Sequence, residues 1–181
     1  PIKSGKGVWL YDYDDNKYLD AISSWWVNIF GHSNTYINGS IKKQLSKLEH
    51  VLLAGFTHEP AINLAEGLIS ITPKKITKCF FTDNGSSSID AAMKMSYHYW
   101  QNKGKKSKKG FIALSNSYHG ETLGSLSVSN IDLYKKTYES ILKDTIIVDS
   151  PDSYRKKENV SEEELSLIHI SEPTRLSLYL V

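Results

Sequence analysis

Apolar and polar positions alternate near the start of the chain. Residues 7–21 read GVWLYDYDDNKYLDA, in which Val8 and Leu10 lie on one side of the alternation. A polar Asp-Asp-Asn step at 14–16 interrupts the run before KYLDA resumes it. Alternation on both sides of a polar turn predicts a β-hairpin.

Three later segments carry apolar residues at helical spacing, which predicts amphipathic helices. The first follows Asn34, a suitable cap, the second begins near Pro60 and stops at Pro73, and the third follows a small-residue turn. Their apolar positions are, in order, Ile37, Ile41, Leu45 and Leu48; Ile62, Ala65, Leu68 and Ile69; and Ile89, Ala92, Met93, Tyr97 and Trp100.

Short apolar runs at 78–82, 111–115 and 145–149 have the length of buried parallel strands. Alternation of such strands with helices predicts an α/β fold with a mostly parallel sheet. The 181 residues, 40% of them hydrophobic, suffice for one globular domain with a core but not for two large ones.

Charge and cysteine content narrow the function classes. The formal net charge of +2 gives no global field that favours nucleic acid or a membrane surface. The lysine-rich run at 103–110 lies between a predicted helix and a predicted strand, so we expect a solvated loop. The single cysteine, Cys79, excludes an intramolecular disulfide and fits a reducing compartment.

The sequence contains no apolar run of the ~18 residues that a membrane helix needs, and no signal peptide is visible. We therefore predict a cytoplasmic protein. The chain begins at Pro1 rather than Met, so we expect the true N-terminus to lie upstream.

The stretch FFTDNGSSSIDAAMKM at 80–95 passes from apolar residues through a small-residue turn into a helix. Gly85 leaves room for a ligand, Ser86 and Ser87 add hydroxyl groups, and the unpaired first N–H groups of a helix favour an anion. The turn matches neither a P-loop nor the dinucleotide-binding fingerprint. It predicts a phosphate site, and a capped helix end without a ligand is the alternative.

Aromatic residues mark two further candidate segments. Tyr118 and His119 follow the 111–115 run, and ligand sites in open α/β sheets gather at the carboxyl ends of strands. Tyr118 either presents a flat face to a ligand or packs on the core. Trp25 and Trp26 are adjacent and cannot share one face of a strand, so at least one is expected to face a cleft or an interface unless both pack in the core.

Other chemistries lack their residue patterns. One cysteine cannot build a zinc site, and a hydrolase nucleophile elbow, Gly-x-Ser-x-Gly, is missing. We expect no metal site, because five of the six histidines are scattered without paired metal-ligand spacing: His32, His50, His58, His98 and His119.

The candidate segments, in their order along the chain, resemble class III, fold-type I aminotransferases that depend on pyridoxal phosphate. The resemblance covers about residues 7–149. The matching text is DAISSWWVNIFGHSN, GFTHEPAINLAEGL, FFTDNGSSSIDAAMKMSYHYWQNKG and SYHGETLGSLSVSN. It implies that the chain is the N-terminal part of such an enzyme: a small-domain segment at 1–50 and an incomplete cofactor-binding α/β domain at 51–160.

The resemblance also implies roles for individual residues. Gly85 and Ser86 would bind the phosphate of the cofactor, and Tyr118 would stack on its ring or line the substrate cleft. Trp25 would contact the substrate, with Trp26 packed behind or beside it.

Within the family, the SSWW and THEPA segments are most similar to members that act in biotin biosynthesis. This implies S-adenosylmethionine as amino donor, 8-amino-7-oxononanoate as acceptor and a homodimer with no nucleic-acid or membrane partner. The alternatives are another class III aminotransferase, acting on ω-amines or on ornithine-like substrates, and a non-catalytic domain that binds a phosphate ligand.

Three functional residues of the family have no counterpart in this chain. They are the lysine that holds the cofactor, the aspartate that pairs with its ring nitrogen and the arginine that binds carboxylates. No catalytic residue is therefore predicted in this chain. The text LSLIHISEPTR at 165–175 matches the translation of a sequencing adapter, so we expect residues 165–181 to be a non-native tail. A genuine amphipathic tail is the alternative, because Ser161 and Glu164 have the spacing of a capping box.

Overall fold

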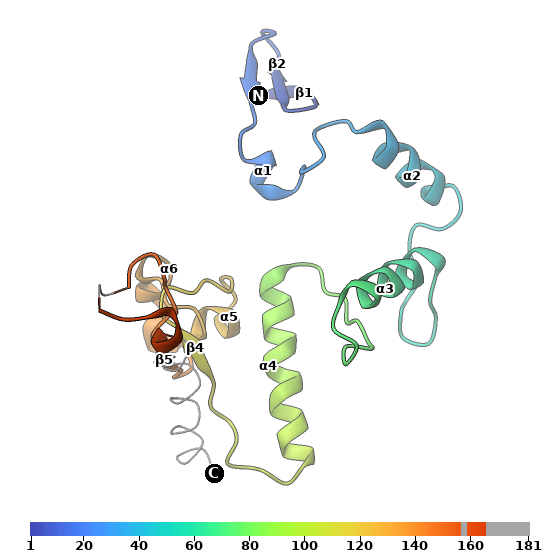
Figure 1. The fold of residues 1–181 in the computed structure, drawn as a ribbon. Coiled ribbons are helices and arrows are strands. Elements are labelled where there is room, and N and C mark those ends of the chain that lie inside the picture. Colours follow the sequence, from blue (N-terminus) through green and yellow to red (C-terminus); the bar gives the residue numbers. More distant parts are fainter. Residues whose placement is uncertain (157–158, 166–181) are drawn as a thin grey trace. The chain divides into compact units, whose positions relative to one another are not determined.

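The computed structural model describes residues 1–156 and 159–165. The chain divides into two units, Pro1–Cys79 and Phe80–Val181. The first unit holds β1 (Ile2–Lys6), β2 (Trp9–Asp12), β3 (Lys17–Leu19) and helical segments α1 (Ser23–Trp26), α2 (Thr35–Leu45) and α3 (Glu59–Ile71) (Figure 1). The second holds α4 (Gly85–Asn102), β4 (Ile112–Leu114), α5 (Leu123–Ser127), α6 (Asp132–Lys135), the short 3₁₀ helix η1 (Lys136–Ile141) and β5 (Ile146–Val148).

The predicted hairpin is confirmed and gains a third strand. β2 pairs antiparallel with β3, with Trp9 opposite Leu19 and Tyr11 opposite Lys17. β1, which the sequence pattern did not predict, pairs antiparallel with the other edge of β2. Its sequence IKSGK has a single large apolar residue, so it gives almost no alternation to detect.

The carboxylate of Asp12 closes the hairpin turn. Oδ1 accepts hydrogen bonds from the backbone N–H groups of Asp14 and Asn16, both at 2.9 Å. Oδ2 accepts from Asn16 Nδ2 at 3.0 Å and from the Tyr18 hydroxyl at 2.8 Å. These donors, led by the Asn16 side chain, lower the pKa of Asp12 from 3.8 to about 2.

This lowered pKa predicts acid sensitivity of the turn. The folded pKa lies below the ordinary value, so the contribution of Asp12 to stability is present above about pH 4 and is lost as the pH falls through about 2. Amide-exchange protection at Asp14 and Asn16, measured by NMR over this range, should fall with pH. An Asp12→Asn variant should lose that pH dependence, and unchanged protection of the parent at pH 2 would contradict the assignment.

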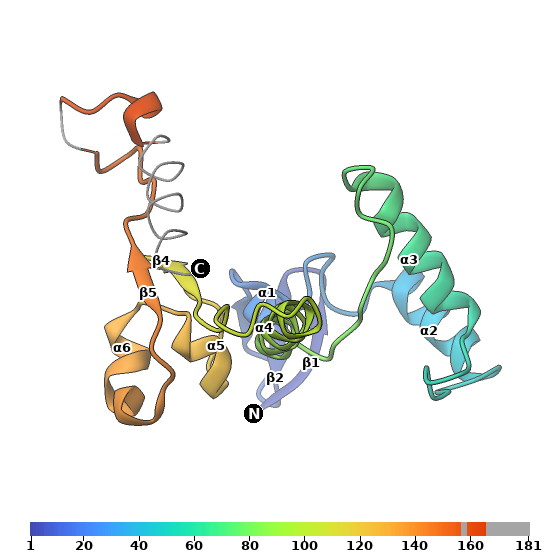
Figure 2. The same ribbon diagram turned by 90° about the horizontal axis from the view of Figure 1, so that it is seen from below.

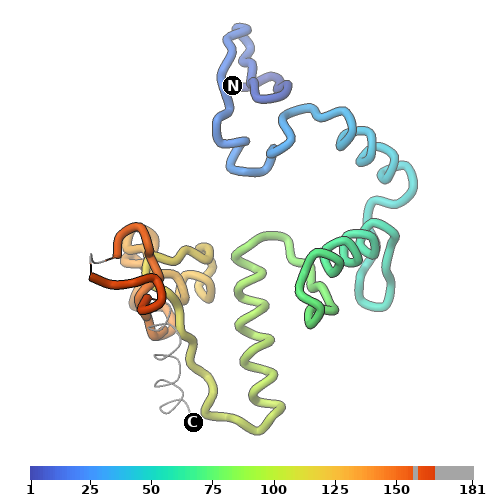
Figure 3. Tube along the Cα trace, in the orientation of Figure 1, coloured from blue at the N-terminus to red at the C-terminus, as the bar shows by residue number. Residues whose placement is uncertain are grey.

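The two predicted helices of the first unit are also confirmed, and Figure 3 follows the trace through them. Asn34 caps α2, because its side-chain oxygen accepts hydrogen bonds from the N–H groups of Tyr36 and Ile37 at 3.1 Å each. α3 begins one residue before Pro60, and His58 Nδ1 accepts from Ala61 N. Leu48 lies beyond the last residue of α2.

The second unit is built on α4 and a parallel pair of strands. β4 and β5 lie side by side, with Ile112 opposite Ile146 and Leu114 opposite Val148 (Figure 2). Both strands and their parallel direction were predicted. Of the apolar residues in the described part of the chain, Ala113, Leu126 and Val128 are buried, all in or beside β4 and α5.

The predicted strand at 78–82 is wrong. Among residues 1–156 and 159–165 this segment pairs with no other strand, and Phe80 is 69% exposed. A strand is stabilised by hydrogen bonds to a neighbour, and an apolar run alone does not supply one. The expected loop at 103–110 is confirmed: it joins α4 to β4, and Lys108 Nζ lies 4.2 Å from the ring centroid of Trp100.

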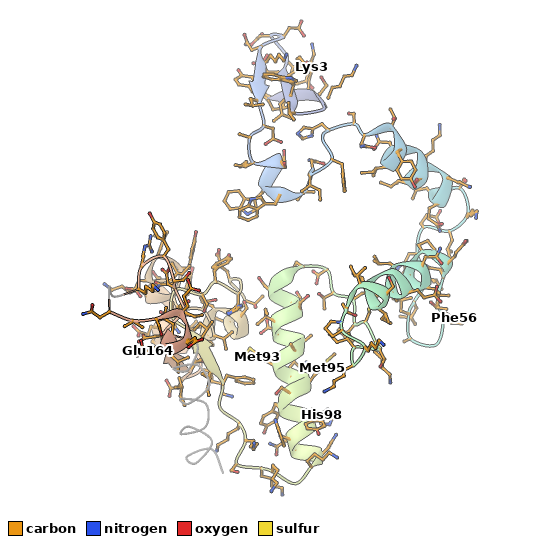
Figure 4. All side chains as sticks on the ribbon, in the orientation of Figure 1. Lys3, Phe56, Met93, Met95, His98 and Glu164 are labelled. Atoms are coloured by element: carbon orange, nitrogen blue, oxygen red, sulfur yellow. The ribbon has the colours of Figure 1, made fainter. Side chains whose placement is uncertain are left out.

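The side chains of α4 point in several directions, and Figure 4 shows Met93 and Met95 on different sides of the helix. Met93 lines a hollow between α4 and β4 together with apolar residues Ile89, Ala92, Phe111, Leu114 and Val128. In the described part of the chain, no helix has the length and apolar character needed to cross a membrane.

Candidate functional site

The predicted phosphate turn forms the N-terminus of α4. Asn84 is the cap residue, with extended backbone, and its side-chain oxygen accepts a hydrogen bond from Ser87 N at 2.9 Å. Gly85 and Ser86 are the first two residues of this 18-residue helix. The sequence folds this way because Asn is a strong cap and the small residues after it leave the first turn open.

The first N–H groups of α4 are available to a ligand. Within the described residues, those of Gly85 and Ser86 have no hydrogen-bond acceptor, whereas that of Ser87 is satisfied by Asn84. A Cβ added at Gly85 would meet no atom within 4 Å, so the space beside the turn is open. Two free N–H donors and the Ser86 hydroxyl form a donor set that suits a phosphate.

One carboxylate stands next to this donor set. The pKa of Asp83 is lowered, first by a hydrogen bond from the Ser87 side chain and to a smaller extent by donors of Asn84. Asn84 Nδ2 donates to Asp83 Oδ2 at 2.9 Å. These donors stabilise the ionised form of Asp83, so a carboxylate lies directly before the turn.

The loop that contains Tyr118 meets the phosphate turn at Ser86. Glu121 N donates to Ser86 Oγ at 3.4 Å, and Gly120 is buried against the same side chain. A Cβ on Gly120 would lie 1.9 Å from Ser86 Oγ and 2.7 Å from Ser86 Cβ. Gly120 also has φ +117, a conformation that residues with a side chain rarely adopt. Glycine is therefore required for the loop to approach the turn.

Tyr118 stands half-exposed on this loop and does not pack in the core. Its hydroxyl donates to Glu121 Oε1 at 2.9 Å, and this bond is the main cause of its raised pKa. Its ring centroid lies 5.2 Å from that of Tyr134. The hydroxyl is thus engaged, while about half of the side chain remains free for contact. His119 is held through its backbone N–H, which donates to Ser129 Oγ at 2.9 Å.

Trp25 and Trp26 lie in the first unit, in a turn that follows the hairpin. They end the turn α1, in which all four residues have positive φ. Their rings stack at 5.1 Å between centroids with a tilt of 38°, and both are about 70% exposed. Neither ring packs in a core formed by the described residues, so that alternative is wrong for both.

The structure thus brings Gly85, Ser86 and the Tyr118 loop together within one unit, and it presents the tryptophan pair on the other. Sequence reasoning missed Glu121 and the carboxylate of Asp20. The Tyr-x-x-Glu spacing of 118–121 could have indicated the first. No sequence signal marks a left-handed turn of Ser and Trp, because these residues have no preference for that conformation.

The capping box at Ser161 and Glu164 forms. Ser161 N donates to Glu164 Oε2 at 2.8 Å, and Glu164 N donates to Ser161 Oγ at 3.0 Å. Hydrogen bonds to the Glu164 carboxylate, first from the backbone N–H of Ser161 and then from its side chain, lower the pKa of Glu164. Residues 166–181, and with them most of the expected non-native tail, lie outside the described residues, so that expectation and the predicted boundaries at 50 and 160 stay predictions.

A sequence model of the family described as "Aminotransferase class-III" matches residues 1–175. The chain belongs to the class III aminotransferase family. The resemblance found in the sequence is therefore confirmed at the level of the family.

Individual class III aminotransferases agree with this assignment. The chain is 50% identical over 161 residues to the adenosylmethionine-8-amino-7-oxononanoate aminotransferase of Helicobacter pylori, which covers 88% of this chain and 36% of that protein. It is 45% identical over 170 residues to the protein of the same name from Staphylococcus aureus, and this match covers 92% of this chain and 38% of that protein. The chain spans a little over a third of the length of these curated relatives.

Solved class III aminotransferase structures share the fold. The structure is similar to the adenosylmethionine-8-amino-7-oxononanoate aminotransferase of Methanocaldococcus jannaschii, with a TM-score of 0.79 and 38% identity over 85% of this chain and 35% of that one. It is also similar to the omega transaminase of Pseudomonas jessenii in complex with PMP, with a TM-score of 0.85 and 29% identity. This match covers 98% of this chain and 40% of that one. The predicted fold class is confirmed as a fold-type I α/β fragment.

Proposed function

We propose that the full-length protein transfers an amino group from S-adenosylmethionine to 8-amino-7-oxononanoate with the help of pyridoxal phosphate, and so yields 7,8-diaminononanoate. The observation that carries the proposal is the open donor set at Gly85 and Ser86 in a chain that is 50% identical to a relative whose name states both substrates. Those N–H groups and the Ser86 hydroxyl fit the phosphate of this cofactor.

Pyridoxal phosphate, when bound, supplies an electron sink for the transfer of the amino group. The residues of this chain bind and orient. Gly85 and Ser86 hold the phosphate through two N–H groups and one hydroxyl. Tyr118, fixed by its bond to Glu121, offers a flat face to the ring or to the substrate. Trp25 and Trp26 offer exposed aromatic surface that suits the substrate.

The same proposal includes a cytoplasmic homodimer. Exposed apolar residues on both units support an extensive interface or further chain packed against them, since monomers rarely expose so much apolar surface. The largest exposures include those of Ile71, Leu133 and Tyr36, each at least 80%.

An omega transaminase is the second candidate, favoured by the TM-score of 0.85 to the Pseudomonas jessenii enzyme. Identity to that enzyme is 29%, against 50% for the Helicobacter pylori relative. Sequence therefore favours the first candidate, and the amino donor distinguishes the two.

The full-length gene product, loaded with pyridoxal phosphate, should convert 8-amino-7-oxononanoate with S-adenosylmethionine and should be much slower with simple ω-amines. The product can be followed by mass spectrometry for each donor. The 181-residue chain by itself should bind pyridoxal phosphate weakly and reversibly and should show no turnover, because the resemblance leaves the cofactor-holding lysine without a counterpart here.

The lysines at 103–109 can form non-specific adducts with pyridoxal phosphate, so the binding test on the 181-residue chain must locate the labelled residues. Borohydride reduction and peptide mapping should find scattered, substoichiometric labelling that inorganic phosphate does not suppress. A single stoichiometric pyridoxyl-lysine in the 181-residue chain, with turnover, would overturn the residue assignments. Turnover by the full-length protein with ω-amines alone would replace the proposed function with the second candidate.

A further inference from the structure

The turn that carries the tryptophan pair has an unusual backbone. The φ angles of Ser23, Ser24, Trp25 and Trp26 are 51°, 48°, 68° and 65°. Left-handed backbone brings the Cβ of an L-residue close to the following carbonyl oxygen, so it occurs mostly at single positions. Four successive residues without a glycine persist in it only when the surroundings hold them.

Asp20 makes the side-chain contacts that hold this turn. Its Oδ1 accepts a hydrogen bond from Ser24 N at 2.9 Å, and its Oδ2 accepts one from Ser24 Oγ at 2.7 Å. Two backbone bonds complete the turn, from Trp26 N to Ile22 O at 2.8 Å and from Asn28 N to Ser23 O at 2.9 Å. The Asp20 side chain is 6% exposed, so water competes little for these donors.

His32 positions the carboxylate of Asp20. Its Nε2–H donates to Asp20 Oδ2 at 2.7 Å, and its side chain is 14% exposed. The backbone of His32 exchanges two hydrogen bonds with Gly7, at 3.0 and 2.8 Å. Its side chain packs on Gly5, where an added Cβ would lie 2.8 Å from His32 Cβ. Side chains and backbone therefore connect the hairpin strand β1 to the tryptophan turn.

We propose that Asp20 is a positioning residue for substrate recognition: together with His32 it holds Ser23–Trp26 in the left-handed turn that presents Trp25. The proposal rests on the proposed function in so far as Trp25 contacts the substrate. Without the carboxylate, no other side-chain acceptor in the described part of the chain offsets the strained backbone of the turn, so the turn relaxes and the two rings separate. The lowered pKa of Asp20, to about 2, agrees with a carboxylate that accepts several hydrogen bonds.

The test uses the full-length protein and its Asp20→Ala and Asp20→Asn variants. The far-ultraviolet exciton signal of the stacked tryptophans, identified as the difference between the parent and a Trp25→Phe variant, reports the turn directly. It should be lost in Asp20→Ala and reduced in Asp20→Asn. The KM for 8-amino-7-oxononanoate should rise about tenfold or more in Asp20→Ala. Asp15→Asn, at an exposed carboxylate of the same unit, is the matched control and should change neither.

A rescue separates support of the turn from support of folding in general. Glycine adopts left-handed backbone without penalty, so Ser24→Gly in the Asp20→Ala background should restore part of the exciton signal and lower the KM again. A role of Asp20 in folding alone would give no such rescue.

The outcomes distinguish the two proposals. An unchanged exciton signal and KM in both Asp20 variants would overturn the positioning role, as would failure of Ser24→Gly to restore either. If Asp20→Ala does not fold, Asp20→Asn with a native helix signal and an unchanged exciton signal would still overturn it. If the parent protein has no aminotransferase activity but the exciton signal is still lost in Asp20→Ala, the role of Asp20 in the turn is supported and the proposed function is contradicted.

Discussion

A Gly120→Ala substitution in the full-length protein is expected to reduce the affinity for pyridoxal phosphate strongly. The new Cβ would lie 1.9 Å from Ser86 Oγ, and φ +117 is strained for alanine. Strain at such a position and overpacking each cost about 1–3 kcal/mol. The loop or Ser86 must move, so the hydroxyl leaves the donor set of the phosphate turn. Titration of the cofactor, followed by absorbance and by thermal stability, measures the loss.

Gly67→Ala is the matched control for this substitution. Gly67 lies inside α3, and an added Cβ there would meet no atom within 4 Å. Alanine should raise stability by about 1 kcal/mol, because it is the better helix former, and cofactor affinity should not change. Equal affinity of the parent and Gly120→Ala would show that the loop does not support the phosphate turn.

A Trp25→Ala substitution is expected to lower kcat/KM for 8-amino-7-oxononanoate relative to other acceptors. The corresponding rise in activation free energy is about 2–4 kcal/mol, the scale of a large aromatic anchor. The ring is 69% exposed and stacks on Trp26, so its removal takes away contact surface without opening a core cavity. The measurement is kcat/KM for this acceptor and for a simple keto acid, with thermal stability recorded for each protein.

Tyr36→Ala provides the comparison for Trp25, because Tyr36 is also a largely exposed aromatic residue, on α2. It should leave the ratio of kcat/KM values unchanged. Trp26→Ala should have an intermediate effect, since it removes the partner ring of Trp25. Equal kcat/KM values for Trp25→Ala and the parent would exclude a substrate contact at this residue.

Local sequence patterns determined most of the regular elements. Asn34 caps a helix as expected, and Asn84 likewise caps the helical run that follows it, because a cap bond joins residues two or three positions apart. The parallel strands β4 and β5 also follow from their short apolar runs. The family could be identified from the sequence alone, since Gly85, Ser86 and the segment at 118–120 lie in stretches that resemble class III aminotransferases.

Contacts between distant residues decided the rest. The run at 78–82 has a strand-like composition but pairs with no strand among residues 1–156 and 159–165, whereas β1 has little pattern but a partner in β2. Gly120 must be glycine because Ser86, 34 positions earlier, lies against it. The left-handed turn of Trp25 and Trp26 depends on Asp20 and on His32, which the hairpin holds. A sequence records the propensity of each residue, whereas strain at 23–26 and close approach at Gly120 are tolerated only because tertiary contacts offset their cost.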